Sequence, residues 1–166
     1  MFLFVWGIII PYGEVDMPEQ ETAAIVAIIL YFLEKEPKIG ITKLESYIIM
    51  LDNMCLENTG KRLFHYRLTY GPHGYYIQNF RAFLDFIEDK KILSKRREYF
   101  TRKKYRIDFT PHQYVSDEIF PKMLLSWMKI IVSIWKGAGA DHTKRDMQRQ
   151  LTPAAIEAFM SIQPLN

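Results

Sequence analysis

The sequence predicts a mainly α-helical fold with a small β-hairpin, and three observations predict it. The chain has 166 residues, of which 49% are hydrophobic and 14% aromatic, so it can bury a sizeable core. Apolar side chains recur at helical spacing in most of its long segments. One charged segment has β-rich arms, as a hairpin has. We therefore expect one domain, with a modest surplus of length for an extension.

Two helices are expected in the first third of the chain. Residues 21–36 are apolar on nearly every side and begin with an acidic residue, which is typical of a buried helix. Thr42 and Glu45 then have the spacing of a capping box, so a second helix is expected to start near Lys43. Its apolar residues recur at helical spacing, and residues 58–60 supply a stop.

The middle of the chain is expected to hold an extended segment, a helix and a hairpin. Residues 62–70 are rich in aromatic side chains and lead into the turn Gly71-Pro72-His73-Gly74. Residues 75–90 carry apolar side chains on one arc of a helical wheel and polar ones on the other, which predicts an amphipathic helix. Residues 92–109 have two β-rich arms around a charged centre, which predicts the hairpin.

The carboxyl-terminal part is expected to be helical. Residues 121–136 begin with a proline and precede a Gly-Ala-Gly stop, and a short final helix is expected over residues 152–162. The first of these helices has a single polar stripe and an apolar seam, which consists of Trp127, Met128, Ile131 and Trp135. Such a seam is buried either by its own domain or in the interface of a homodimer or a protein complex.

The amino-terminal segment and the cysteine content bear on location. Residues 1–10 are apolar, but Pro11 ends them well short of the ~20 residues that a membrane-spanning helix needs. They are expected to form a buried or edge strand, or to be translated upstream sequence before a true start at Met17. The single cysteine, Cys55, excludes an intrachain disulfide. We expect a cytoplasmic protein that does not bind membranes.

Positive charge is concentrated in one segment. The net charge of the chain is +3, but residues 81–106 hold ten basic and four acidic side chains, so this segment carries +6 and the rest −3. A basic hairpin with interleaved aromatic side chains is suited to nucleic-acid phosphates; the alternatives are a solvated edge or a protein contact. The residues expected at a nucleic-acid interface are Gln78, Arg81, Lys95, Arg96, Arg97, Arg102, Lys103, Lys104 and Arg106.

The helix predicted for residues 75–90 is a weaker candidate for contacting bases. Its first turn offers Gln78 and Arg81, whose side chains match the hydrogen-bonding groups of base edges. Its second half carries acidic side chains such as Asp85 and Glu88, which repel a phosphate backbone. We therefore expect the hairpin to dominate binding, with weak sequence selectivity.

The predicted order of helix, helix, extended segment, helix and charged hairpin is that of a winged helix, in which a two-stranded wing follows the third helix. Residues 40–110 add a helix ITKLESYIIMLDN, an aromatic segment ending in Tyr70-Gly71-Pro72 and a tyrosine-rich KKYRIDFT. These features resemble a family of small bacterial and archaeal winged-helix-like proteins with a Y-G-P turn, related to SocA-like or Panacea-type antitoxin domains. The resemblance implies a regulator that contacts DNA, or an antitoxin that captures a toxin protein.

No catalytic or metal-binding arrangement is predicted. The Gly71-Pro72-His73-Gly74 turn lacks the spacing of phosphate-binding loops, the four histidines are not spaced as a ligand pair, and Cys55 is expected to be a small buried residue. We expect a non-enzymatic winged-helix regulator without cofactor or metal over residues 17–110, with residues 111–166 as a helical extension that packs on it and mediates oligomerisation. The alternative is a protein-binding antitoxin or adaptor.

Overall fold

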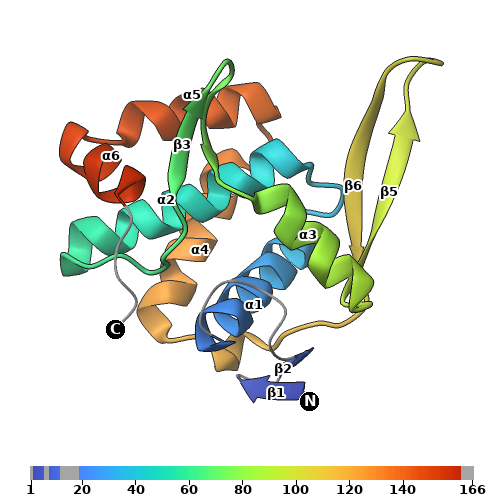
Figure 1. Cartoon of the computed structure of the whole chain (residues 1–166), viewed down its shortest axis with the longest axis horizontal. Helices are drawn as coiled ribbons and strands as arrows, with labels where there is room; N and C mark the ends of the chain where they lie inside the picture. Colours follow the sequence, from blue (N-terminus) through green and yellow to red (C-terminus); the bar gives the residue numbers. More distant parts are fainter. Residues whose placement is uncertain (1, 6–7, 12–18, 162–166) are drawn as a thin grey trace.

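Helices dominate the structure, a computed structural model that describes residues 2–5, 8–11 and 19–161 (Figure 1). The helices are α1 (Glu19–Lys35), α2 (Ile41–Thr59), α3 (Phe80–Asp89), a 3-10 turn η1 (Asp117–Ile119), α4 (Lys122–Trp135), α5 (Ala140–Gln150) and α6 (Pro153–Met160). The strands are β1 (Phe2–Val5), β2 (Ile8–Pro11), β3 (Leu68–Gly71), β4 (Gly74–Ile77), β5 (Leu93–Tyr99) and β6 (Tyr105–Pro111). Within the described residues they form three two-stranded antiparallel sheets, β1–β2, β3–β4 and β5–β6. The prediction of a mainly α fold with a small hairpin is confirmed.

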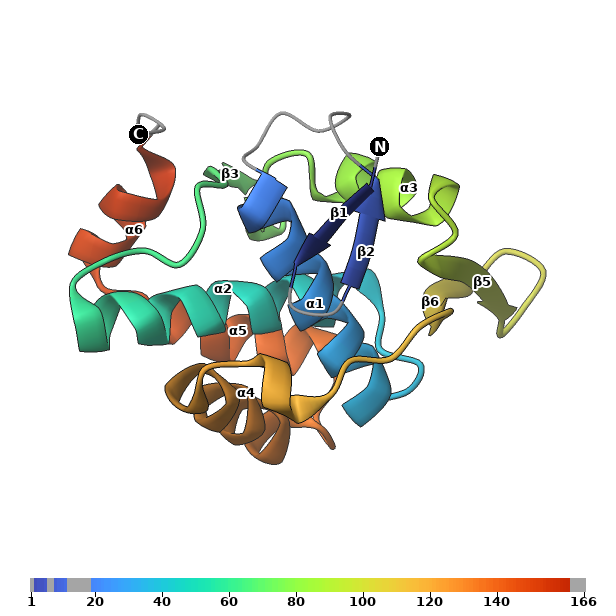
Figure 2. The same cartoon turned by 90° about the horizontal axis from the view of Figure 1, so that it is seen from below.

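The centre of the core is formed by α1 and α2. Every residue of α1 from Ile25 to Leu33 is buried, as the apolar character of this segment predicts. Phe32 of α1 meets Tyr47 of α2 edge to face, with ring centres 5.1 Å apart. The helices α4 and α5 cover α2, and Figure 2 shows α4 on one side of α2 and α3 on the other. The carboxyl-terminal helices therefore complete the core.

The start of α2 differs from the predicted one. The helix begins at Ile41, and its N-cap is Gly40, with no side-chain cap hydrogen bond. The capping box predicted for Thr42 and Glu45 is therefore wrong, because both residues lie inside the helix and Gly40 is its N-cap. Gly40 is fixed from outside the helix by an isolated antiparallel bridge to Asp108 of β6. A contact between residues far apart in the chain thus sets the start of α2.

The helix predicted for residues 75–90 begins later, so that prediction is wrong at its start. Residues Gly74–Ile77 form β4 and pair with β3, and α3 begins only at Phe80. The aromatic and β-branched side chains of β4 favour a strand, but they also fall on the apolar arc of the helical wheel. The extended segment predicted for residues 62–70 is a strand only from Leu68 onward.

The predicted charged hairpin is confirmed as β5 and β6. The strands pair from Leu93 opposite Pro111 to Tyr99 opposite Tyr105. Its base is anchored in the core, since Leu93 and Phe109 are 0% and 4% exposed. Its outer half projects away from the helices, beyond α3 (Figure 1). We call this hairpin, residues 93–111, the wing.

The apolar seam of α4 packs inside the chain. The seam residues are Trp127, Met128, Ile131 and Trp135. Their side chains are at most 9% exposed, and α4 contacts both α1 and α2. The structure therefore follows the alternative in which the seam packs on its own domain. The prediction that these four residues bind a partner is wrong, because side chains so enclosed are not available to another molecule.

The structure contains a helix, α5, that the sequence analysis does not predict. Its sequence is polar nearly all round, and only Thr143 and Met147 are buried. Two buried positions are too few to produce a recognisable apolar stripe. The final helix is confirmed as α6, and its N-cap Thr152 accepts a hydrogen bond from the Ala155 N–H at 3.1 Å.

The amino-terminal apolar segment forms the strands β1 and β2, which lie beside α1 (Figure 2). They pair with Phe2 opposite Pro11, in agreement with the strand alternative. Met17, the alternative start, lies outside the described residues. No helix in the described ranges is both long and apolar enough to cross a membrane.

Candidate functional site

At the base of the wing, Arg96 is bound to the protein itself. Its Nε and Nη2 donate to the two carboxylate oxygens of Asp108, at 3.1 Å each. Asp108 is 1% exposed, and its hydrogen bonds and charge raise the pKa of Arg96. A bidentate pair of this kind offsets the charge of the arginine. Arg96 is therefore less available to a phosphate than its place in the basic segment indicates.

Lys95 is turned toward α3. Its ammonium group forms an ion pair with Asp85 and lies 3.8 Å from Glu88 Oε1, and its backbone N–H donates to Glu88 Oε2 at 2.7 Å. Partial burial, and then the positive charge of Arg81, lower the pKa of Lys95. The acidic side chains of α3, which we expected to repel phosphates, thus face a lysine of the wing that offsets part of their charge.

The turn of the wing, residues 100–104, presents exposed cations. They are Arg102, Lys103 and Lys104. Among the described residues, these three side chains have neither a hydrogen bond nor an ion pair. The turn is closed by the Phe100 N–H, which donates to the Lys104 C=O at 2.8 Å, and the Phe100 ring is 64% exposed. We call residues 100–104 the wing tip.

The remaining predicted interface residues lie on the wing and around the start of α3. Arg97 is exposed on β5, and Arg81 is exposed in the first turn of α3. Gln78 is exposed but precedes the helix, and its backbone N–H donates to the Arg67 C=O at 2.9 Å. The side chain of Arg106 lies outside the part of the chain that the structure describes. The base-contacting role predicted for the first turn therefore rests on Arg81 alone.

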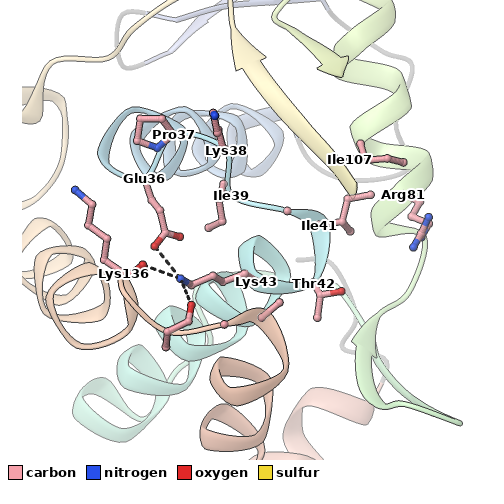
Figure 3. A pocket seen from close by; sticks show the side chains of 14 residues that line it. Glu36, Pro37, Lys38, Ile39, Ile41, Thr42, Lys43, Arg81, Ile107 and Lys136 are labelled. Carbon is pink, nitrogen blue, oxygen red and sulfur yellow. Dashed lines mark hydrogen bonds and ion pairs between the residues drawn. The ribbon is translucent and has the colours of Figure 1, made fainter. Parts of the chain in front are cut away.

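Two neighbouring pockets meet at Arg81. The first has a volume of about 730 Å³ and lies between the start of α2, the end of α4 and β6 (Figure 3). The second has a volume of about 790 Å³ and lies between the start of α2, the β3–β4 turn, the start of α3 and α5. Ile41 and Thr42 line both pockets. The start of α2 and Arg81 thus separate two hollows on the side of the molecule that bears the wing.

The first pocket contains a buried ion pair. Lys43 Nζ donates to Glu36 Oε1 at 2.8 Å and to the backbone C=O groups of Lys136 and Ala138, at 3.1 and 2.7 Å (Figure 3). These contacts use all three N–H groups of the ammonium. Because they join the end of α1 and the start of α2 to the end of α4, we assign Lys43 a structural role.

The second pocket has a carboxyl group in its wall, and we call it the Glu45 pocket. Glu45 is 8% exposed, and its Oε2 accepts a hydrogen bond from the Ile77 N–H at 3.2 Å. Burial raises the pKa of Glu45 to about 7, while that hydrogen bond and the charges of Lys144 and Arg81 act in the opposite direction. This pocket therefore holds a carboxyl group that titrates near neutral pH.

The Y-G-P-H-G segment has a structural explanation. A side chain at Gly71 would approach the Tyr76 ring to 2.8 Å, and one at Gly74, where φ is 98°, would collide with the Gln148 carboxamide. Gln148 Oε1 instead accepts a hydrogen bond from the Tyr75 N–H at 2.9 Å. The two glycines thus let the hairpin pack closely and let α5 dock on it.

Several residues of the Glu45 pocket escape sequence reasoning. Lys144 and Arg145 belong to α5, which has no apolar pattern to reveal it, and Glu45 is assigned to a helix cap on its local spacing. Cys55 is buried, as expected. Within the described residues, no group of three or more His, Cys, Asp or Glu side chains is placed to hold a metal ion.

Neither protein-family models, nor the curated proteins, nor the solved structures contain a match to this chain. The resemblance to the winged-helix-like family with a Y-G-P turn therefore stays a prediction.

Proposed function

We propose that the chain is a non-enzymatic winged-helix regulator that binds nucleic acid through the wing. The observation that carries this proposal is the wing tip, where Arg102, Lys103 and Lys104 are exposed on a hairpin that projects from the body (Figure 1). A projecting basic turn reaches a phosphate backbone without steric hindrance from the helices. The cations closer to the body are engaged by the protein itself: Lys95 pairs with Asp85 of α3, and Arg96 joins β5 to Asp108 of β6 within the wing.

The kinds of side chain on the wing and at the start of α3 predict how the protein binds nucleic acid. Phosphate contacts supply affinity but carry no sequence information, and they make binding depend on salt through counterion release. Arg81, whose charge acts on Lys95 of the wing, is the group placed to contact base edges. We therefore expect binding to double-stranded nucleic acid with a steep salt dependence and little sequence preference.

The test is a titration of a fluorescent DNA duplex, followed by anisotropy, at low and high salt. Replacing Arg102, Lys103 and Lys104 together by Ala is expected to weaken binding at least tenfold at low salt, and to reduce the slope of log affinity against log salt by up to about 3. The control replaces Lys122 and Lys129 of α4 by Ala, which removes positive charge elsewhere. Unchanged affinity and slope in the wing-tip variant would overturn the proposal.

A second candidate function, a protein-binding antitoxin or adaptor, is favoured by the outer face of α4. Met123, Ile130 and Ile134 are 54%, 43% and 59% exposed there and fall at helical spacing. The lysines of α4 flank this face, so a partner with an apolar surface bordered by acidic residues fits it better than a second copy of the chain. Co-purification with the product of an adjacent gene, lost in Ile130→Asp, is the result expected from this function; co-purification that Ile130→Asp leaves intact counts against it.

A further inference from the structure

We infer that the Glu45 pocket is a binding site for a nucleoside phosphate, whose phosphate groups meet the cations of α3 and α5 and whose base faces Glu45. This inference does not rest on nucleic-acid binding by the wing. It is carried by the cations, the buried carboxyl group and the aromatic wall that meet in one hollow.

Three cations from two helices line the pocket. Arg81 comes from α3, and Lys144 and Arg145 are neighbours on α5. In the described part of the chain, none of these side chains makes a hydrogen bond or an ion pair. Asp141 and Glu45 are the acidic residues among the lining side chains, so cations are in excess. Such an excess around one hollow favours a ligand with several negative charges.

The Glu45 pocket also has a carboxyl group and aromatic side chains in its wall. Glu45 is 8% exposed, and only its Oε2 is bonded, to the Ile77 N–H. No donor within the described residues reaches its Oε1. Tyr76, which is 40% exposed, and Phe80 line the same pocket as Glu45. A carboxyl oxygen and aromatic side chains that line one pocket suit a flat heterocycle that carries an N–H group.

Simpler ligands leave part of the pocket unused. An inorganic phosphate satisfies the cations but leaves Tyr76 uncovered, and it is repelled by Glu45 when that group is ionised. A nucleoside without phosphate meets Glu45 and Tyr76 but leaves the excess of positive charge in the pocket unneutralised. The volume of about 790 Å³ lies within the range of small-molecule sites. A nucleoside phosphate is the ligand class that uses both halves.

The test is calorimetric titration of the full chain with the common ribonucleoside diphosphates, with inorganic pyrophosphate and with the corresponding nucleosides. At least one nucleoside diphosphate is expected to bind about tenfold or more tightly than pyrophosphate, and its nucleoside more weakly than either. Absence of binding by every diphosphate, or equal affinity for pyrophosphate, would overturn the inference.

Two variants assign the contacts. Lys144→Ala with Arg145→Ala is expected to weaken nucleoside diphosphate binding at least tenfold, whereas Lys122→Ala with Lys129→Ala leaves it unchanged. Glu45→Gln keeps the shape of the side chain and removes its charge, so it is expected to reduce the preference for the nucleoside diphosphate over pyrophosphate. An unchanged preference in Glu45→Gln would show that the base does not face this residue and would refute the assignment.

The wing-tip variant separates this site from the proposed function. Replacement of Arg102, Lys103 and Lys104 is expected to leave nucleoside diphosphate affinity unchanged while it weakens DNA binding. Loss of both activities in that variant, with its thermal midpoint unchanged, would mean that nucleotides bind at the wing rather than in the Glu45 pocket.

Discussion

At the scale of single residues, Glu45 shows how a distant contact decides a role that local spacing misassigns. Its position three residues after Thr42 is the spacing of a capping box, but the carboxyl group bonds to the Ile77 N–H, 32 positions away. No pattern within one helix contains this information. The burial of Cys55 was accessible from sequence because it follows from the apolar face of its own helix.

The raised pKa of Glu45 predicts a dependence of stability on pH. Folding raises this pKa from 4.5 to about 7, so between these values the native state binds more protons than the unfolded state. The contribution of Glu45 to the free energy of unfolding therefore falls as pH rises from about 4.5 to 7 and is constant above that, a loss of up to about 3 kcal/mol.

Glu45→Gln removes this titration. We expect the free energy of unfolding of the variant, measured by urea denaturation, to rise relative to that of the natural chain between about pH 5 and pH 8. Other titrating groups contribute equally to both proteins, so they cancel in the difference. A difference between the two proteins that does not change with pH would contradict this expectation.

At the scale of elements, a helix or strand is predicted correctly where its own sequence has a clear apolar pattern. Prediction fails where contacts with another element stabilise the structure. Helix α1 is evident from its sequence, and so is the wing. Helix α5 is missed because it buries only Thr143 and Met147, and its position depends on packing against α2 and on the hydrogen bond of Gln148 to the β3–β4 hairpin. The late start of α3 has the same origin, since β4 forms by pairing with β3.

Gly74 is where this docking is most easily tested. Gly74→Ala is expected to destabilise the protein by roughly 1 to 3 kcal/mol, because alanine is strained at φ 98° and its Cβ collides with the Gln148 carboxamide. Adding Gln148→Ala removes the collision but leaves the backbone strain. The double variant should therefore lose less stability than the sum of the single variants, as measured by thermal or urea unfolding; strict additivity would show that the two residues do not interact.

At the scale of the whole molecule, the wing projects from the helical body (Figure 1). The base of the wing is anchored by Leu93 and Phe109, whereas the wing tip projects into solvent. The predicted order of helices and hairpin is observed, but the division into residues 17–110 and a packed extension understates the second part. Because α4 and α5 cover α2, the extension belongs to the core, which the sequence could not show without the spatial neighbours of α2.

Replacing residues 100–104 by Asn-Gly tests the role of the wing tip. Tyr99 and Tyr105 are paired, and a two-residue Asn-Gly turn closes an antiparallel pair of this kind. We expect the thermal midpoint to stay within a few degrees of that of the natural chain, because the side chains of Arg102, Lys103 and Lys104 make no hydrogen bond or ion pair within the described residues. DNA affinity is expected to fall as in the wing-tip Ala variant. A large drop in the midpoint would show that the tip contributes to folding.

The ion pair at Lys43 has a consequence for synthesis of the chain. Its ammonium group bonds to Glu36, near the amino end, and to the carbonyl groups of Lys136 and Ala138. During translation those carbonyls emerge from the ribosome long after α1 and α2. Until then, one face of α2 is uncovered, and Lys43, which is buried in the folded protein, lacks two of its three hydrogen-bond acceptors. The core therefore closes only once the segment after α4 has been synthesised, and until then the nascent chain exposes one face of α2 to aggregation or to capture by chaperones.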